Sequence, residues 1–304
     1  MSQFEIPADQ RRPVATLGVL LLLLFVFYWG TLLVTSTTWN SPEYSHGWLV
    51  PLFAGVLLWL RREPIEDPSA SARWAGLGIL VAGLTLRMAG AFIGYQYFDM
   101  LSFLPCLFGI FLIVGGWQML RWAGPALGFL IFMYPLPSAV SRAVLNPLQR
   151  VATVCSTYAL QTLGIAAFRS GNVIQLGEAK LNVVEACSGL RMSTIFLAMA
   201  VAVTLVTVRP TWERIVIILS SVPIALLVNV IRITMTGVIY QMIGVEIGDR
   251  FFHGPAGWIM MPIAMGFLFL ELQVLANLLV VDEDVQAAPV GMSPMGAPRA
   301  RGKT

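Results

Sequence analysis

The sequence predicts an all-α polytopic membrane protein of about eight transmembrane helices, with one small external β-hairpin just before Cys187. Three observations support this prediction. The chain is 57% hydrophobic and only 12% charged, whereas soluble domains are about 45–50% apolar and about 25% charged. Apolar runs of membrane-crossing length recur along it. Basic residues gather at the ends of these runs, so the net charge of +3 reports orientation and does not indicate nucleic-acid binding.

The predicted spans follow from the length of the apolar runs. A helix needs about 20 apolar residues to cross a bilayer. The first run is too long for a signal-peptide core and has no clear A-x-A cleavage site, so it is interpreted as a retained span. The second and fifth runs are shorter than this length, so the sequence does not define where these two spans begin and end. The eight segments lie near residues 14–34, 46–60, 74–94, 100–120, 122–135, 188–208, 215–240 and 256–281.

Arginines in the short loops predict the orientation. If all eight segments cross, these arginines fall on one side, which the positive-inside rule makes cytoplasmic. Both termini are then cytoplasmic. Residues 282–304, which are rich in Pro, Gly, Ala and Met, are predicted to be a disordered cytoplasmic tail. The arginines are Arg11, Arg12, Arg61, Arg62, Arg73, Arg121, Arg209 and Arg214.

The opposite side carries two polar stretches, residues 40–48 and 136–187. The longer one contains an amphipathic helix over about residues 139–163, in which apolar residues recur at helical spacing between arginines and a glutamine; this pattern is typical of a helix lying at the membrane interface. Runs at 173–176 and 181–184 flank a glycine-containing turn and predict a small hairpin. This hairpin leads the chain to Cys187 at the outer membrane surface.

Cys187 stands where a polar segment ends and an apolar run begins. If that run is a helix, Cys187 and Arg191 lie one turn apart on the same face. The free N–H groups and partial positive charge at a helix N-terminus favour a thiolate. A small residue at a helix start with a nearby charge explains the same pattern, so both interpretations stay open on this stretch alone.

Two further polar residues belong to the same side of the predicted topology. Arg232 lies inside the seventh segment, roughly 12 Å before its outer end near Tyr240, where an arginine is costly and is expected to face a polar interior. Asn229 shares its helical face, and His253 directly precedes the eighth segment. A structural ion pair and an interfacial histidine are the alternatives. Chemically, a thiolate can attack a carbonyl, a histidine can exchange protons, and an arginine can stabilise an oxyanion.

Cysteines and histidines are too few and too scattered for a disulfide framework or a metal centre. The three cysteines form no CxxC pair, and the chain has two histidines. The sequence therefore predicts no metal and no other cofactor. Cys106 and Cys155 are expected to be buried thiols. Within the spans, Arg87 is expected to pair with Asp99 or a carbonyl group, and Glu271 with an arginine at the inner face.

Several motifs resemble those of the exosortase/archaeosortase family. The resemblance extends over about residues 40–270, and its most specific block surrounds Cys187. A histidine at the third motif points to the bacterial exosortases, because archaeal relatives carry arginine there. The motifs are Glu185-Ala186-Cys187-Ser188-Gly189-Leu190-Arg191, Asn229-Val230-Ile231-Arg232, His253-Gly254-Pro255-Ala256-Gly257-Trp258, and, upstream, Tyr44-Ser45-His46-Gly47-Trp48-Leu49-Val50-Pro51 and Pro135-Leu136-Pro137.

The resemblance implies a cysteine transpeptidase whose catalytic set is Cys187, Arg232 and His253. Its partners would be membrane-anchored proteins whose C-terminal sorting signal combines a Pro-Glu-Pro-type motif, a transmembrane helix and a basic cluster. Cleavage would proceed through a cysteine thioester, with transfer to an acceptor in the envelope. Residues 1–281 would form one transmembrane catalytic domain in the bacterial inner membrane, with its active site on the periplasmic face. The candidates for binding substrate or shaping the site are Arg191, Asn229, His46 and Glu185.

Two other functions stay open at the level of sequence. In a transporter or flippase, Arg232 and Arg87 would line a substrate path, and Cys187 would be dispensable while these arginines would not. In a non-catalytic scaffold for exopolysaccharide export, substitutions of Cys187, Arg232 and His253 would all be tolerated. Substitution of these residues therefore separates the three functions.

Overall fold

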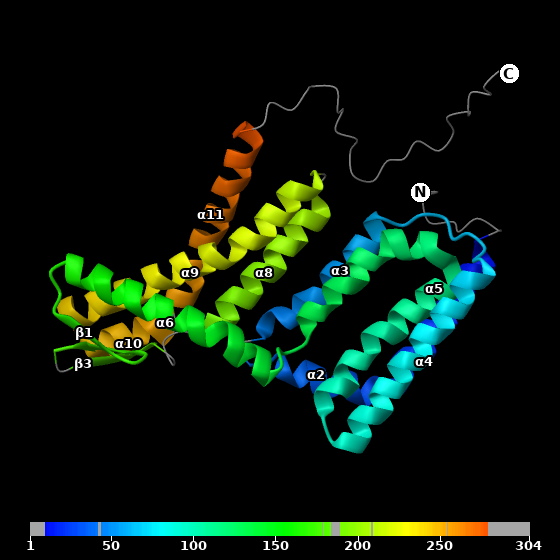
Figure 1. Cartoon of the computed structure of the whole chain (residues 1–304), viewed down its shortest axis with the longest axis horizontal. Coiled ribbons are helices and arrows are strands. Elements are labelled where there is room, and N and C mark those ends of the chain that lie inside the picture. The colour runs from blue at the N-terminus through cyan, green and yellow to red at the C-terminus, as the bar shows by residue number, and fades with distance from the viewer. Residues whose placement is uncertain are drawn as a thin grey trace.

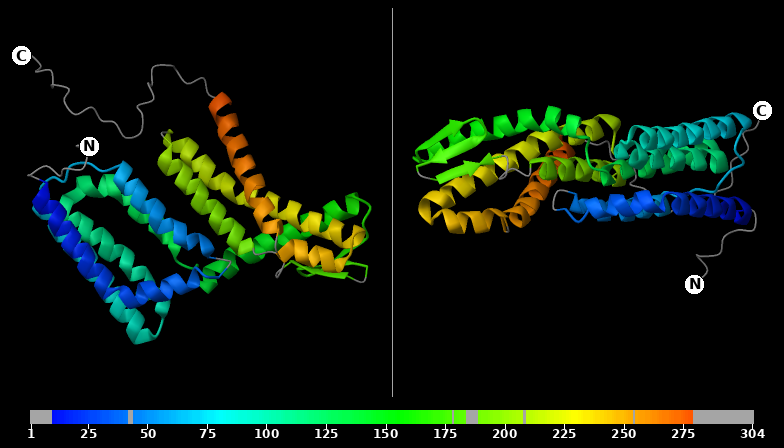
Figure 2. Two further views of the ribbon diagram at one scale, coloured as in Figure 1. Left: turned by 180° about the vertical axis from the view of Figure 1, so that it is seen from behind. Right: turned by 90° about the horizontal axis from the view of Figure 1, so that it is seen from below.

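The computed structural model describes residues 10–41, 44–177, 179–183, 189–207, 209–253 and 255–278. This part of the chain is mostly α-helical, as predicted. Residues 11–133 form one half of the molecule, the amino-terminal half, and residues 138–278 form the carboxy-terminal half beside it (Figure 1). The same division is visible from behind and from below (Figure 2).

The first predicted span is a broken helix. It consists of α1 (Arg11–Phe27) and α2 (Trp29–Thr38), which are bent by 67° at the break. A short 3₁₀ turn, η1 (Ser45–Trp48), then leads into α3 (Leu49–Leu60). The second predicted span is therefore helical, but its α-helix has only 12 residues.

Two long helices form the core of the amino-terminal half. They are α4 (Ala70–Ile93) and α5 (Gln96–Phe129), and α5 continues into the 3₁₀ turn η2 (Leu130–Met133). Gly94 ends α4 in the left-handed conformation, with φ of 72°, which glycine adopts without a steric cost. The chain can therefore reverse within two residues, and α4 packs along α5.

Glycines at every seventh position of α4 allow this close packing. Gly76, Gly83 and Gly90 face α5, and a Cβ atom on Gly83 would lie 2.6 Å from Sγ of Cys106. A Cβ atom on Gly76 would lie 2.9 Å from the Gly109 carbonyl oxygen. Small residues let membrane helices approach until their backbones make van der Waals contact, which replaces the hydrophobic driving force that lipid removes.

Replacing Gly83 by leucine is expected to lower the free energy of unfolding by about 1–3 kcal/mol, because the side chain would overpack the α4–α5 interface. The thermal midpoint in detergent measures this loss. Gly78 on the same helix has no atom within 4 Å of a Cβ, so Gly78→Leu is the matched control and should leave the midpoint unchanged or raise it. Equal losses in the two variants would contradict an interface role for Gly83.

Helix α5 reverses direction at Gly116, where φ is 65° and ψ is −164°. Its two arms run in opposite directions (Figure 1). These arms correspond to the fourth and fifth predicted segments, 100–120 and 122–135. An L-residue side chain disfavours this backbone conformation, so the glycine turns one continuous apolar stretch into a hairpin.

The carboxy-terminal half begins with the predicted amphipathic helix, which is α6 (Ser138–Thr162). Three strands follow: β1 (Ala167–Ser170), β2 (Val173–Leu176) and β3 (Ala179–Asn182). They form one antiparallel sheet in the order β1-β2-β3. The predicted hairpin is confirmed as β2 and β3. The second strand of this hairpin begins two residues earlier than the predicted run at 181–184. Strand β1 was not predicted, since its sequence, Ala-Phe-Arg-Ser, contains no β-branched residue.

The remaining helices assemble around one central helix. They are α8 (Gly189–Val206), α9 (Thr211–Met242), α10 (Val245–His253) and α11 (Pro255–Leu278). Helix α9 contacts α6, α8, α10, α11 and β2. It corresponds to the seventh predicted span and is the element against which the others are positioned.

Eight crossings are not established by this structure. Within the described ranges, three helices are long and apolar enough to cross a membrane: α4, α5 with η2, and α9. The bent pair α1 and α2 makes a fourth if it is one span. The other predicted spans have shorter apolar helices, at Ser45–Leu60, Ser193–Val206 and Pro262–Leu275. Breaks and bends shorten the helices, and the apolar length of a sequence does not reveal them.

The connections divide between two sides of the molecule. The α3–α4 connection, the reversal in α5, the α8–α9 connection and the C-terminal end of α11 lie on the upper side in Figure 1. The α4–α5 turn, the sheet and α10 lie on the lower side. The connections that carry the arginines from which the orientation was predicted lie on the upper side.

Candidate functional site

Arg232 lies in the middle of the carboxy-terminal half and faces protein. The residue is 6% exposed, and Asn229, one turn earlier on α9, is also 6% exposed. Both lie on the buried face of α9, while Leu227 and Met235 on its other faces are 45% and 38% exposed. A guanidinium in this position is shielded from lipid and acts in surroundings of low dielectric constant, where its electrostatic effect is strong.

Helix α6 turns its hydroxyl groups toward the segment of α9 that contains Arg232. Thr153 and Ser156 are fully buried, and the Ser156 hydroxyl donates a hydrogen bond of 3.4 Å to the Val230 carbonyl oxygen. The opposite face is apolar and open, with Val154 48% and Tyr158 69% exposed. The polar face of this amphipathic helix therefore meets protein and its apolar face is available to lipid, which agrees with a position at the membrane interface.

The small sheet is fixed against the same part of α9. Ile174, Leu181 and Val183 are almost completely buried in one cluster with Leu160 of α6 and Ile233 of α9. Ile233 is the residue that follows Arg232. Since β3 ends at Asn182, the chain enters residues 184–188 from a point that is packed beside this level of α9.

The start of α8 lies at the same level. Helices α8 and α9 run antiparallel (Figure 1), and Phe196 packs in one cluster with Ala225. Gly189 lies seven residues before Phe196 on α8, about 10 Å along the helix axis. Because α9 runs in the opposite direction, the same distance from Ala225 leads forward along α9 to Arg232. The first turn of α8 therefore lies near the level of Arg232 along the α9 axis.

The end of α10 also returns to this level. Helix α10 folds back along the last turns of α9 (Figures 1 and 2). Gly248 allows close contact, since a Cβ atom there would lie 2.1 Å from Cδ1 of Tyr240. Tyr240 lies about 12 Å after Arg232 along α9. From Gly248, which is beside Tyr240, α10 runs about 7.5 Å back in the opposite direction to His253. The backbone at His253 is therefore within about one helical turn of the level of Arg232.

The structure describes both backbone and side chain for some of the predicted site residues, and only the backbone for others. Arg232 and Asn229 are described in full, as buried neighbours on α9. His253 ends α10, and Arg191 lies in the first turn of α8; their side chains lie outside the description. Cys187 and Glu185 lie outside the described residues.

His46 is positioned by a different part of the fold. It lies in η1, which packs against α2, α3 and η2. Its ring is 6.4 Å from the ring of Tyr44, and the neighbouring Trp39 and Trp48 rings are 5.0 Å apart. The Trp39 indole donates a hydrogen bond of 2.7 Å to the Met133 carbonyl oxygen. His46 thus belongs to an aromatic cluster of the amino-terminal half.

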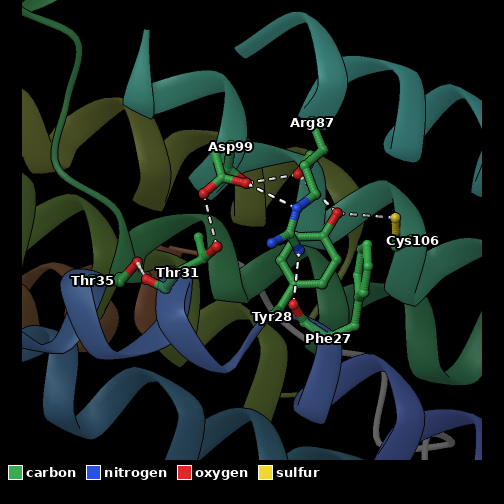
Figure 3. A network of polar contacts seen from close by, with 8 residues as sticks. Phe27, Tyr28, Thr31, Thr35, Arg87, Asp99 and Cys106 are labelled. Atoms are coloured by element: carbon green, nitrogen blue, oxygen red, sulfur yellow. Dashed lines mark hydrogen bonds and ion pairs between the residues drawn. The ribbon is translucent and has the colours of Figure 1, made fainter. Parts of the chain in front are cut away.

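Arg87 forms the predicted ion pair with Asp99, with 3.3 Å between Nε and Oδ1. Its Nη1 atom also donates to the Phe27 carbonyl oxygen at 3.1 Å, and its guanidinium carbon lies 4.1 Å from the centroid of the Tyr28 ring (Figure 3). Phe27 is the last residue of α1, so Arg87 binds a carbonyl group that the break between α1 and α2 leaves without a helical partner. The ion pair with Asp99 holds the Arg87 guanidinium in place, and the hydrogen bond to Phe27 stabilises the bend.

A second group of hydrogen bonds extends this polar cluster. The Tyr28 hydroxyl lies 2.9 Å from Oγ of Ser102 and 3.4 Å from Sγ of Cys106, and Thr31 donates to Oδ2 of Asp99 at 2.7 Å (Figure 3). Cys106 is buried, as predicted. The prediction for Cys155 is wrong: it is exposed, because it lies on the outward apolar face of α6.

The prediction for Glu271 is also wrong. Among the described residues, the ion pairs are those of Arg87 with Asp99, Arg209 with Glu213 and Arg250 with Glu246. Oε2 of Glu271 is buried without a hydrogen-bond partner in that part of the chain. The position of Glu271 in the sequence predicts that it lies toward the inner end of α11. It does not predict the distance between Glu271 and an arginine on another helix.

Sequence reasoning did not single out the hydroxyl groups of α6. The signal was available, because Thr153, Ser156 and Thr157 recur at helical spacing opposite Val151 and Val154.

The fold and the site define a helical membrane protein with a buried arginine in a long apolar helix, beside a hydroxyl-lined amphipathic helix and a small sheet.

A family model described as transmembrane exosortase matches residues 38–270, more than half of the chain, and the chain belongs to this family. Exosortases are membrane cysteine transpeptidases that act on protein substrates. The matched range contains Cys187, Arg232 and His253. No curated protein and no solved structure matches the chain significantly.

Proposed function

We propose that this protein is a membrane-embedded cysteine transpeptidase that removes PEP-type C-terminal sorting signals from membrane-anchored proteins. The observation that carries the proposal is the common level of three elements. The start of α8, the end of α10 and the buried Arg232 of α9 lie within about one helical turn of one another along the α9 axis. Cys187 precedes α8 by two residues, and His253 ends α10.

In the proposed reaction, Sγ of Cys187 attacks the scissile carbonyl carbon and its proton passes to the His253 imidazole. The carbonyl oxygen becomes an oxyanion, which the Arg232 guanidinium stabilises. Collapse of this intermediate breaks the peptide C–N bond, and His253 returns the proton to the leaving amine. The products are a thioester on Cys187 and the released C-terminal signal. A nucleophile of the envelope acceptor then attacks the thioester and regenerates the thiol.

The neighbouring polar residues have supporting roles in this proposal. Asn229 lies one turn before Arg232 and is suited to orient its guanidinium. Arg191 follows Cys187 by one helical turn, and Glu185 precedes it by two residues; both are proposed to contact the substrate beside the scissile bond. His46 is assigned a structural role in its aromatic cluster.

We further propose that the chain crosses the bacterial inner membrane eight times, with both termini in the cytoplasm and the site on the periplasmic face. The support is the grouping of arginine-bearing connections on the side opposite the sheet and α10 (Figure 1). In this orientation, the apolar face of α6 lies in the outer interface and its hydroxyl groups face the site.

The test is co-expression with a tagged protein that ends in a Pro-Glu-Pro motif, a transmembrane helix and a basic cluster. The expected result is loss of the C-terminal signal from the tagged protein, measured by intact mass. A covalent adduct of enzyme and substrate that hydroxylamine releases identifies the thioester. A substrate of unchanged mass, with enzyme present and folded, would contradict the proposal.

The transporter alternative loses one of its two supports. It requires Arg87 on a substrate path, yet Arg87 is engaged by Asp99, by the Phe27 carbonyl group and by two aromatic rings. These contacts account for an arginine within a span without a transported ligand.

A further inference from the structure

Two arginines meet where the two halves of the molecule join, away from the site proposed above. Arg61 ends α3, and its Nη2 atom donates a hydrogen bond to the Leu205 carbonyl oxygen near the end of α8. Arg214 lies in the first turns of α9. Burial lowers the pKa of Arg61, and the nearby positive charge of Arg214 lowers it further. Both arginines therefore lie beside the connection between α8 and α9, where their positive charges repel each other.

No carboxylate in the described part of the chain forms an ion pair with either arginine. Glu213, which is buried, is bound by Arg209 at 2.7 Å. Nε of Arg214 is buried without a hydrogen-bond partner in the same part of the chain. The N-terminus of α9 also lacks a capping side chain, so its partial positive charge adds to that of the arginines. A bound anion would balance this concentration of positive charge.

The surroundings indicate which anion fits. Trp59, near the end of α3, is 55% exposed, and the guanidinium carbon of Arg62 lies 5.3 Å from the centroid of its ring. Trp212, in the first turn of α9, is 47% exposed. Exposed tryptophans at helix ends mark the level of lipid headgroups. Apolar side chains such as Val56 and Leu219 are open on the adjoining turns of the same two helices.

We propose that Arg61 and Arg214 form a binding site for the phosphate group of an anionic phospholipid, at the junction between α3, α8 and α9. Planar guanidinium groups bind phosphate oxygens through paired hydrogen bonds. The phosphate neutralises the two arginines, and its acyl chains cover the apolar faces of α3 and α9. The lipid thereby ties the amino-terminal half to the carboxy-terminal half.

The test uses the full chain in a neutral detergent, with phosphatidylglycerol, phosphatidylcholine or inorganic phosphate added separately. A ligand that binds only the folded state raises the thermal midpoint. We expect phosphatidylglycerol to raise it by several degrees and the other two additives to leave it unchanged. In native mass spectrometry, Arg61→Gln and Arg214→Gln should each weaken phosphatidylglycerol binding by about tenfold, because each removes a charge-assisted contact.

Arg73 provides the matched control, since it is exposed and lies in the first turn of α4. The start of α4 is on the same side of the molecule as the α8–α9 connection (Figure 1). Arg73→Gln should bind phosphatidylglycerol like the wild type. Should a glutamine variant fail to fold, Arg61→Lys and Arg214→Lys keep the charge and should still bind less tightly than the wild type. Equal affinity in the wild type and in the Arg61 and Arg214 variants would overturn the proposal.

Two further outcomes would assign the arginines to another anion. An equal rise in midpoint with inorganic phosphate would show a site for free phosphate and not for lipid. A response to phosphatidylglycerol that appears only after the joint substitution Asp282→Asn, Glu283→Gln and Asp284→Asn would assign the arginines to the chain's own acidic segment. Either result would exclude the lipid as the anion that the wild-type protein binds at these arginines.

Discussion

Cys187→Ala should abolish removal of the sorting signal, with a fall in rate of at least about 1,000-fold, as loss of the nucleophile causes in other enzymes of this mechanism. A small side chain before a helix contributes little packing, so the variant should fold and insert normally. Cys187→Ser should also be nearly inactive, because a hydroxyl is far less acidic than a thiol and one histidine is a poor activator for it. The measurement is accumulation of full-length substrate in the membrane.

The other two cysteines are the controls. Cys155 is exposed on the outward face of α6, and Cys106 is buried beside Tyr28. Cys155→Ala should process substrate at the wild-type rate, and Cys106→Ala should do so per folded molecule. The hydroxylamine-sensitive adduct should form in both of these variants and be absent from Cys187→Ala. Wild-type rates in Cys187→Ala would return the chain to the transporter or scaffold alternatives.

Arg232→Lys should lower the rate of processing by about 100-fold or more although the charge is kept. Loss of one well-placed oxyanion donor has an effect of this size. The guanidinium presents a planar pair of donors, which the lysine ammonium cannot reproduce. Because Arg232 is 6% exposed, folding must be measured together with activity, and the rate is taken per folded molecule.

Arg87→Lys is the matched control for this substitution, since Arg87 is also an arginine within a helix that can cross the membrane. It should lower stability, because the contacts with Asp99 and the Phe27 carbonyl group are weakened, but it should keep the processing rate per folded molecule. If Arg232→Lys were as active as Arg87→Lys, Arg232 would be a counter-charge without a role in the reaction.

Most of the local structure of this protein could be predicted from its sequence. Continuous apolar runs predicted helices at all eight expected positions, and two β-branched runs joined by a glycine-containing turn predicted the β2–β3 hairpin. The amphipathic helix was predicted within one residue of α6 at each end. The pairing of Arg87 with Asp99 was also predicted, since these two charges stand near the facing ends of consecutive helices. All these features depend on neighbours in the sequence.

The way in which these elements meet depends on long-range packing and could not be predicted from the sequence. The reversal at Gly116 and the break at Tyr28 set which helices are long enough to cross a membrane, and no apolar count contains them. The return of α10 along α9 depends on the contact of Gly248 with Tyr240. The inward polar face of α6 depends on its packing against α9. These arrangements arise because side chains distant in sequence must fill one another's gaps, and hydrophobic periodicity carries no information about which surfaces will pair.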